Sequence, residues 1–372
     1  MIIKNAKIVD EDFVLKKADV EIDDGKILRV QDDISYSDKD LVLDCEGFTV
    51  VPGFIDLHIH GCVGRDTCDC DRQALSEMAE YLLSNGVTTF CPTTLTVSEE
   101  ILAQVLATVR ECVDNPPEGA AIAGVNMEGP FISKAKKGAQ NEKYVIEPDF
   151  ELFQRLYDDY GGIIKLVDIA PEVKGGYEFA QKASKLCTVS IAHTCATFED
   201  AEKSFDCGIT HATHLFNAMT GLSHRAPGVV GAVFDDERIY GELICDGHHV
   251  DPAVVRTAFK VMGDRICVVS DALMMSGMPE GMEADMGGLH ASVKNGTAVL
   301  DDGTIAGSIT NLHEELKNLV AWGIPLERAV KAMSINPARQ IGIDGVTGSI
   351  QAGKRADLVI LDDELNIVAV YH

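Results

Sequence analysis

The sequence has few basic residues and no long apolar segment. It contains 32 Lys and Arg against 59 Asp and Glu, which gives a net charge of −27. A chain this acidic repels nucleic acid and anionic membranes, so we expect neither as a partner, although one local Arg or Lys suffices to hold a small anion. No stretch approaches the ~20 apolar residues of a membrane span, and the first residues lack a signal-peptide pattern. We therefore expect a soluble, cytoplasmic protein.

Cysteine pairs of the CxxC kind are also missing. The 11 cysteines are scattered, and several, such as Cys187 and Cys245, lie inside apolar runs. Such cysteines are typical of small buried residues in a reducing compartment. The cluster Cys62, Cys68 and Cys70 lacks the ligand spacing of a zinc site, so we favour a structural role for it over metal binding.

Eight apolar runs alternate with helical segments in the middle of the chain. Continuous apolar runs are typical of buried parallel strands. Helix signals lie between them: Ser98 and Thr197 are suited to cap helices, and Gly86 ends one. The eight predicted strands are residues 54–60, 87–93, 121–128, 163–170, 188–193, 209–215, 240–245 and 266–271.

This alternation predicts an α/β fold, a (β/α)8 TIM-type barrel that spans residues 53–343. A doubly wound open sheet is the alternative, but it normally gathers its functional residues at one switch point and not at most strand ends. Short strand-like runs at both ends of the chain predict a small β-sandwich domain made of residues 1–52 and 344–372. We interpret the Gly- and Met-rich residues 272–310 as an insertion after the eighth strand.

Residue types that bind metals end most of the predicted strands. His58 and His60 are two apart on the first strand, so both side chains point to the same face. Glu128 ends the third strand, His193 the fifth and His214 the sixth. The carboxyl ends of barrel strands share one rim, and imidazole with carboxylate suits zinc and similar divalent ions. The sequence therefore predicts a metal centre at this rim.

Asp271 ends the eighth strand. A carboxylate beside a metal-bound water can take its proton and later give it to a leaving group. A helix N-cap is the alternative interpretation, but the Gly-rich sequence that follows does not begin a helix. We predict Asp271 as both a metal ligand and the general base.

Three other polar sites are expected to have no catalytic part. His211 lies three residues before His214, so strand alternation favours a packing role on the other face. Lys165 stands near the start of its strand, the wrong end for a carboxylated lysine that bridges two metals. The segment 313–315, His-Glu-Glu, lacks the HExxH pattern and is expected on the surface of an outer helix.

The order HxH, Glu, His, His, Asp, with a β-domain built from both termini, resembles the amidohydrolase superfamily. Within it, the chain is similar to the N-acetylglucosamine-6-phosphate deacetylase family over essentially its whole length. The Glu-Gly-Pro segment at residues 128–130 and the Thr-His-Leu-Phe-Asn-Ala-Met segment at residues 213–219 are the most specific matches. Other matching segments are residues 52–56, 137–139, 170–172, 192–194, 225–228, 246–251, 270–272, 336–339 and 352–357.

The resemblance implies metal-dependent hydrolysis of N-acetylglucosamine 6-phosphate to glucosamine 6-phosphate and acetate. Glu128, His193 and His214 would hold the main ion. His58 and His60 would give capacity for a second ion, with Glu128 as the bridge. The expected cofactor is one or two divalent ions per subunit, zinc first, with iron, manganese or cobalt as alternatives.

The resemblance also implies a set of substrate-binding residues. Asn217 and the backbone at Ala218 would help to hold the substrate, and His249 would contact sugar hydroxyls. Arg225 would pair with the phosphate, reaching across from the other subunit of a homodimer. The planar guanidinium group suits that role.

One position departs from the family pattern. Gln140 follows Ala139 where some members have a His that helps to polarise the amide carbonyl. Both residues are expected at the substrate, but Gln donates a hydrogen bond without carrying positive charge.

Two other functions remain open from the sequence. The first is a different amidohydrolase, such as a deaminase or a cyclic-amide hydrolase, against which Asn217 and Arg225 argue. The second is an inactive relative that serves as a binding protein. Such a chain should have lost metal ligands or the aspartate, and all six are present.

Overall fold

The eight predicted strands form one nearly closed parallel sheet in the computed structural model, which describes residues 1–372. Neighbouring strands pair in chain order, and a parallel bridge between Ile59 and Ala272 joins the two ends of the sheet. The predicted barrel is therefore confirmed. Its strands are β8 (Phe54–Ile59), β11 (Val87–Thr94), β13 (Val125–Met127), β14 (Ile164–Ile169), β15 (Thr188–Ile191), β16 (His211–Ala212), β17 (Tyr240–Leu243) and β18 (Ile266–Val268).

The strands are shorter than predicted where the chain bends. The third predicted strand is split into β12 (Ala121–Ile122) and β13 by Gly124, whose φ is +148°. A Cβ at Gly124 would come within 2.4 Å of the Ile163 carbonyl oxygen, so only glycine lets the chain approach β14 this closely. The sixth strand, β16, keeps two of its seven predicted residues because the chain turns out of the sheet before His214.

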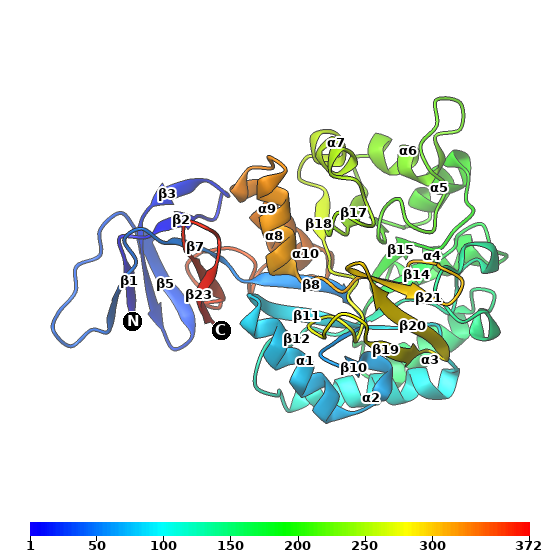
Figure 1. The fold of residues 1–372 in the computed structure, drawn as a ribbon, viewed down its shortest axis with the longest axis horizontal. Helices are drawn as coiled ribbons and strands as arrows, with labels where there is room; N and C mark the ends of the chain where they lie inside the picture. The colour runs from blue at the N-terminus through cyan, green and yellow to red at the C-terminus, as the bar shows by residue number, and fades with distance from the viewer.

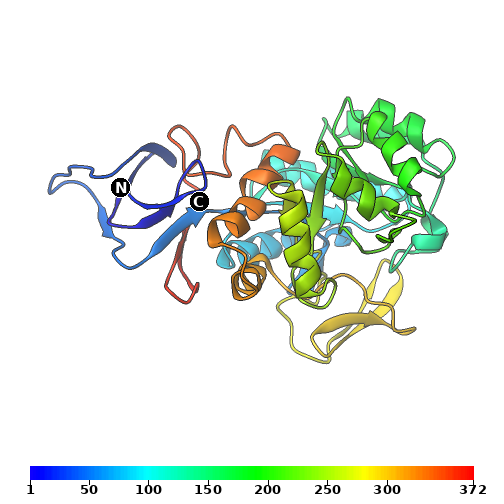
Figure 2. The same ribbon diagram turned by 90° about the horizontal axis from the view of Figure 1, so that it is seen from above.

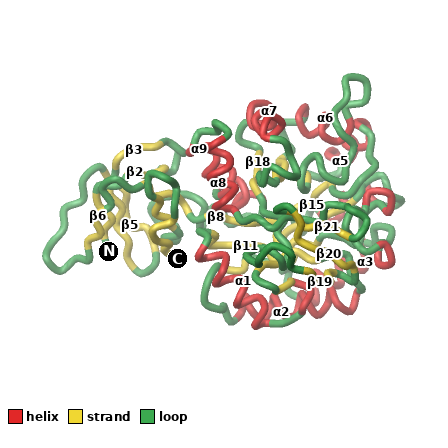
Figure 3. The backbone as a smooth tube through the Cα atoms, in the orientation of Figure 1, coloured by secondary structure: helices red, strands yellow, loops and turns green.

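Helices surround the strands, as the ribbon and the tube both show (Figures 1 and 3). The predicted capping residues are confirmed: the Ser98 hydroxyl accepts from the backbone of α2, and Thr197 forms a capping box on α5. None of these helices combines the length and the apolar composition of a membrane span. The helices are α1 (Arg72–Ser84), α2 (Glu99–Asp114), α3 (Phe150–Asp159), α4 (Gly176–Ala183), α5 (Phe198–Asp206), α6 (Gly228–Asp235), α7 (Pro252–Met262), α8 (Leu312–Ala321), α9 (Leu326–Met333) and α10 (Ile335–Gln340).

Strands from the ends of the chain form two further sheets beside the barrel, and the C-terminal strands belong to one of them (Figure 1). The two sheets share an apolar core that includes Ile3, Val20, Val50 and Leu358. We propose that residues 1–52 and 344–372 form a domain of their own around this core. One sheet contains β1 (Ile2–Lys4), β4 (Asp19–Asp23), β5 (Lys26–Gln31) and β6 (Val42–Asp44), and the other β2 (Lys7–Val9), β3 (Leu15–Lys17), β7 (Thr49–Pro52), β22 (Leu358–Leu361) and β23 (Ile367–Tyr371).

The chain after β18 forms a small antiparallel sheet of its own. Its strands are β19 (Glu283–Met286), β20 (Leu289–Lys294) and β21 (Thr297–Leu300). Figure 2 shows this sheet projecting to one side of the barrel. The predicted insertion is therefore present, and it forms part of a cavity wall.

The expectation that residues 313–315 lie on the surface is wrong for two of the three. His313 and Glu315 are buried, because α8 turns the face that carries them toward the barrel. His313 donates from Nε2 to the Leu365 carbonyl oxygen at 2.6 Å. The Glu315 carboxyl has no hydrogen-bond partner, and burial raises its pKa well above the ordinary value.

Asp357 lies where the terminal sheets meet the barrel. Its carboxylate accepts from Arg355 Nε at 2.7 Å, from His372 Nδ1 at 2.9 Å and from the Thr347 hydroxyl. Arg355 also donates to Thr89 of β11 at 2.8 Å. Burial alone would raise the pKa of Asp357, but these partners outweigh it and lower the pKa.

We expect Asp357→Asn to lower the free energy of unfolding by about 1–3 kcal/mol near neutral pH, because the amide cannot replace the ionised acceptor. The pKa is lower in the folded state than in the unfolded state. The stabilisation is therefore complete above the unfolded value, near 3.8, and is lost as the pH falls through the folded value. Urea unfolding of both proteins, near neutral pH and near pH ~3, measures the difference. A difference that does not shrink in acid would contradict this assignment.

Candidate metal centre

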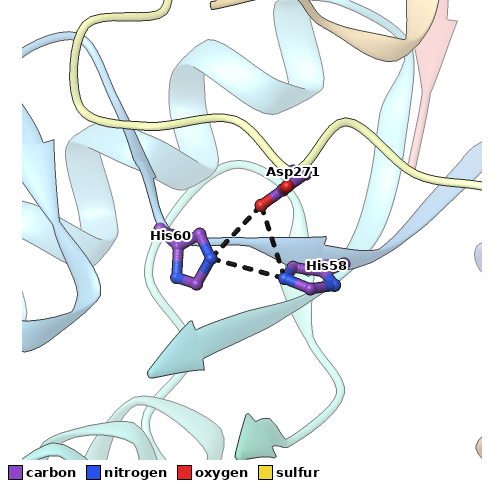
Figure 4. Close-up of side chains that lie close together, drawn as sticks. All are labelled: His58, His60 and Asp271. Atoms are coloured by element: carbon purple, nitrogen blue, oxygen red, sulfur yellow. Dashed lines mark hydrogen bonds and ion pairs between the residues drawn. The ribbon is translucent and has the colours of Figure 1, made fainter. Parts of the chain in front are cut away.

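The six predicted metal-binding side chains form two buried groups at the carboxyl ends of the barrel strands. The first group contains His58 and His60 from β8 and the following residue, with Asp271 beyond β18 (Figure 4). The two Nε2 atoms lie 3.3 Å apart, and Asp271 Oδ1 lies 3.4 Å from that of His58 and 3.2 Å from that of His60. Two imidazoles and a carboxylate therefore face one point.

Glu128 joins this group to the second one, which contains His193 and His214. Its Oε1 lies 3.1 Å from the Nε2 atoms of both histidines and 3.5 Å from that of His58. Its Oε2 lies 3.3 Å from His60 Nε2. One carboxylate thus contacts four imidazoles, which is the geometry expected of a bridging ligand.

The hydrogen bonds on the outer side of the rings indicate which nitrogens are free. Three histidines have an acceptor at Nδ1: the Glu242 carboxylate for His58 at 3.0 Å, and carbonyl oxygens for His60 at 3.2 Å and for His193 at 2.8 Å. Each of these rings can donate outward from Nδ1, which leaves its Nε2 directed at the centre for a proton or a metal ion. The Nε2 atoms of His193 and His214 lie only 3.1 Å apart. A divalent ion between them would accept both Nε2 lone pairs, so the residues fit such an ion.

The backbone bends where three of these side chains leave the strands. His193, His214 and Asp271 have φ values of +42°, +31° and +46°. Non-glycine residues adopt positive φ rarely, at a cost of about 1–3 kcal/mol each, and they do so mainly at functional sites. The bends turn the side chains inward over the barrel, which a continued strand would not do.

Charge at the centre keeps both carboxylates ionised. Burial alone would raise the pKa of Glu128, but the surrounding imidazoles hold it well below the ordinary value. The same balance of burial against His58 and His60 lowers the pKa of Asp271. Burial also opposes protonation of His60, yet its contacts with Asp271 and Glu128 raise its pKa to about 10. The centre therefore favours positive charge, whether protons or metal ions.

Glu242 is a site residue that the sequence analysis missed. It is buried on β17 and accepts from His58 Nδ1 at 3.0 Å, from His211 Nε2 at 3.1 Å and from the backbone N–H of His214 at 3.1 Å. His211 is buried and belongs to neither metal-binding group, as predicted, and its contact supports Glu242. In the sequence, a Glu within the otherwise uncharged residues 240–245 was the feature that could have identified it.

A cavity of about 340 Å³ opens above the metal-binding groups. Of the predicted substrate residues, Ala139, Gln140, Asn217, Ala218 and His249 line it. The insertion also lines it, through residues such as Met286 and Ile305.

Two of the predicted substrate residues already have hydrogen-bond partners within the chain. The Gln140 amide donates to Glu128 and accepts from the backbone N–H of Thr96 at 2.7 Å. His249 Nδ1 lies 2.7 Å from Asp246 Oδ2, so Asp246, which the sequence analysis also missed, fixes the orientation of this ring.

Arg225 is the one predicted substrate residue that does not line the cavity of its own chain. It is exposed in the loop between β16 and α6, and it makes no ion pair. Lys165 lies near the start of β14, in a different cavity from the metal-binding groups, as expected. The thiols of Cys62, Cys68 and Cys70 are free, and neither group includes them.

Comparison with known proteins agrees with this geometry. A sequence model of the amidohydrolase family matches residues 49–371. An N-acetylglucosamine-6-phosphate deacetylase from Bacillus subtilis is 34% identical and covers 99% of this chain and 94% of its own. An N-acetylgalactosamine-6-phosphate deacetylase from Escherichia coli O157:H7 is 30% identical, with 100% and 97% covered.

A solved structure extends the likeness to the fold. A mutant N-acetyl-D-glucosamine-6-phosphate deacetylase from Mycobacterium smegmatis, in complex with N-acetyl-D-glucosamine-6-phosphate, has a TM-score of 0.93 at 30% identity. The alignment covers 100% of this chain and 97% of the other. The chain therefore belongs to the amidohydrolase family and, within it, groups with the N-acetylglucosamine-6-phosphate deacetylases.

Proposed function

We propose that the protein hydrolyses the acetamide of N-acetylglucosamine 6-phosphate, giving glucosamine 6-phosphate and acetate. One observation carries the proposal: Glu128 contacts four imidazoles beside an ionised Asp271, at a cavity large enough for a phosphorylated sugar. The relatives named above support this substrate class. An inactive binding protein is disfavoured, because all six metal-centre residues converge.

Glu128, His193 and His214 would hold one divalent ion, and His58, His60 and Asp271 a second that shares Glu128. Such ions polarise a carbonyl oxygen and lower the pKa of water. Asp271, ionised and at the edge of the cavity, takes the proton from the attacking water as the bond to the carbonyl carbon forms. Asp271 then passes this proton to the amide nitrogen as the C–N bond breaks.

The cavity walls would orient the sugar. His249, held by Asp246, would contact hydroxyl groups, and Asn217 with the backbone at Ala218 would hold the other side. Because Gln140 is neutral and donates to Glu128, we propose that it orients this carboxylate more than it polarises the substrate. Ala139 would help to shape the cavity wall.

We propose zinc as the metal, with iron, manganese or cobalt as substitutes, because mixed imidazole and carboxylate ligands suit all four. We further propose a cytoplasmic homodimer, since Arg225 lies outside the cavity of its own chain and would have to reach the phosphate from a neighbouring subunit. Analytical ultracentrifugation tests the dimer, and metal analysis of the purified protein tests the ion.

The deciding experiment measures acetate release from N-acetylglucosamine 6-phosphate after chelation and metal add-back. The unphosphorylated sugar and N-acetylgalactosamine 6-phosphate are tested in parallel, because one relative is named for the latter compound. We expect turnover that returns with metal and prefers the phosphorylated gluco substrate. Absence of acetate with every divalent metal would exclude the proposal, and preference for N-acetylgalactosamine 6-phosphate would redirect it.

A further inference from the structure

We infer that Lys136 holds the phosphate group of the substrate from within the same subunit. The inference rests on the proposed function. Lys136 ends the short 3-10 helix η2 (Lys134–Lys136), in the loop that follows β13. It is the only Lys or Arg that lines the cavity above the metal-binding groups, whereas Arg225 lies outside it.

The Lys136 ammonium group points at the loop that carries the substrate residues. Its Nζ donates to the Met219 carbonyl oxygen at 3.3 Å, beside Asn217 and Ala218. An ammonium group has three donors, so this contact leaves two for a ligand. The backbone N–H of Ala218 has no partner in the chain, and Ala218 lines the same cavity. Lys136 and this N–H together offer donors to an anion.

No acidic group neutralises this lysine. Lys136 makes no ion pair, and its side chain is half-buried. The cavity otherwise contains the carboxylates of Glu128 and Asp271, in a chain of net charge −27. Bound metal ions would neutralise the two carboxylates, so the repulsion that a phosphate dianion meets comes from the net charge of the chain, and a local cation offsets it. A single lysine therefore attracts the phosphate and directs the other end of the sugar to the metal-binding groups.

Lys136 supports the metal centre through its backbone and not through its side chain. Its carbonyl oxygen accepts from His193 Nδ1 at 2.8 Å and so orients a metal ligand. A change of side chain leaves that acceptor in place. Lys136→Met keeps the aliphatic stem and removes only the charge and its donors, which separates phosphate binding from support of His193.

The test compares Lys136→Met with Lys134→Met, a matched control on the same helix that does not line the cavity. For Lys136→Met we expect KM for N-acetylglucosamine 6-phosphate to rise about 10- to 100-fold with kcat little changed, as for loss of a hydrogen bond to a charged group. Inhibition by inorganic phosphate should weaken by a similar factor. Metal content, and kcat/KM for unphosphorylated N-acetylglucosamine, should match the wild type.

Three outcomes would overturn the inference. The first is an unchanged KM and an unchanged phosphate inhibition constant in Lys136→Met. The second is an equal loss with phosphorylated and unphosphorylated sugar, which would place the effect at His193 and not at the phosphate. The third is the same defect in Lys134→Met. Failure of the wild type to release acetate at all would instead remove the proposed function, so the two failures are distinguishable.

Discussion

Asp271→Asn should lower kcat by about 10²- to 10⁴-fold, the range for loss of a general acid–base group. Asn has nearly the same shape, but its amide nitrogen cannot take a proton from water at neutral pH. The Asp271 pKa is lowered, so the wild-type carboxylate is ready to act as a base. Steady-state kinetics on N-acetylglucosamine 6-phosphate measures the loss. KM should change much less, because the sugar contacts lie elsewhere in the cavity.

The variant should keep its fold, since the bend at Asp271 is held by backbone contacts. The Asp271 N–H donates to the His58 carbonyl oxygen at 2.8 Å, and its own carbonyl accepts from Ser308 at 2.7 Å. Glu315→Gln is the control: this buried carboxyl has a raised pKa and lies outside the cavity, so a neutral amide should leave turnover near wild type. If Asp271→Asn kept more than about a tenth of kcat, another group would be the base.

The sequence predicted the barrel because its strands have a regular composition. Runs such as residues 54–60 and 87–93 are rich in apolar residues, and the structure buries both faces of β8 and β11. The metal-binding residues followed from the same regularity, since parallel strands place their ends on one rim. The strand ends were overestimated at His193 and His214, because a positive φ in non-glycine residues leaves no trace in composition.

The residues that were missed act through partners far away in the sequence. Glu242 contacts His58 across 184 positions, and no local spacing encodes that pair. Nothing in the local sequence distinguishes Lys136 from a surface lysine, because its place in the cavity depends on the distant loop around Ala218. Glu315 was placed on the surface because charged residues usually lie there. The structure instead buries its carboxyl without a partner.

Glu128→Gln should abolish metal binding at both groups. The carboxylate contacts all four imidazoles, and an amide would offer those nitrogens a neutral oxygen and an N–H₂ donor. Even loss of a residue that merely orients a ligand weakens metal affinity about 10- to 100-fold, so loss of the shared ligand should exceed that. Metal analysis after dialysis, together with acetate release, measures the effect.

Thermal unfolding gives a readout independent of activity. A ligand at about 1,000 times its Kd stabilises the native state by ~4.1 kcal/mol, so added metal should raise the wild-type Tm and chelation should lower it. Glu128→Gln should respond to neither treatment.

The matched variant Glu242→Gln should separate the two groups. Glu242 orients His58, whereas its contact with His214 is to the backbone N–H. The Glu242→Gln variant should therefore bind the ion at His58, His60 and Asp271 about 10- to 100-fold more weakly than the wild type. It should keep the ion at Glu128, His193 and His214. Two ions in the wild type, one in Glu242→Gln and none in Glu128→Gln would establish Glu128 as the bridge. One ion in both the wild type and Glu242→Gln would contradict the two-ion arrangement, because the histidines of β8 would then bind none.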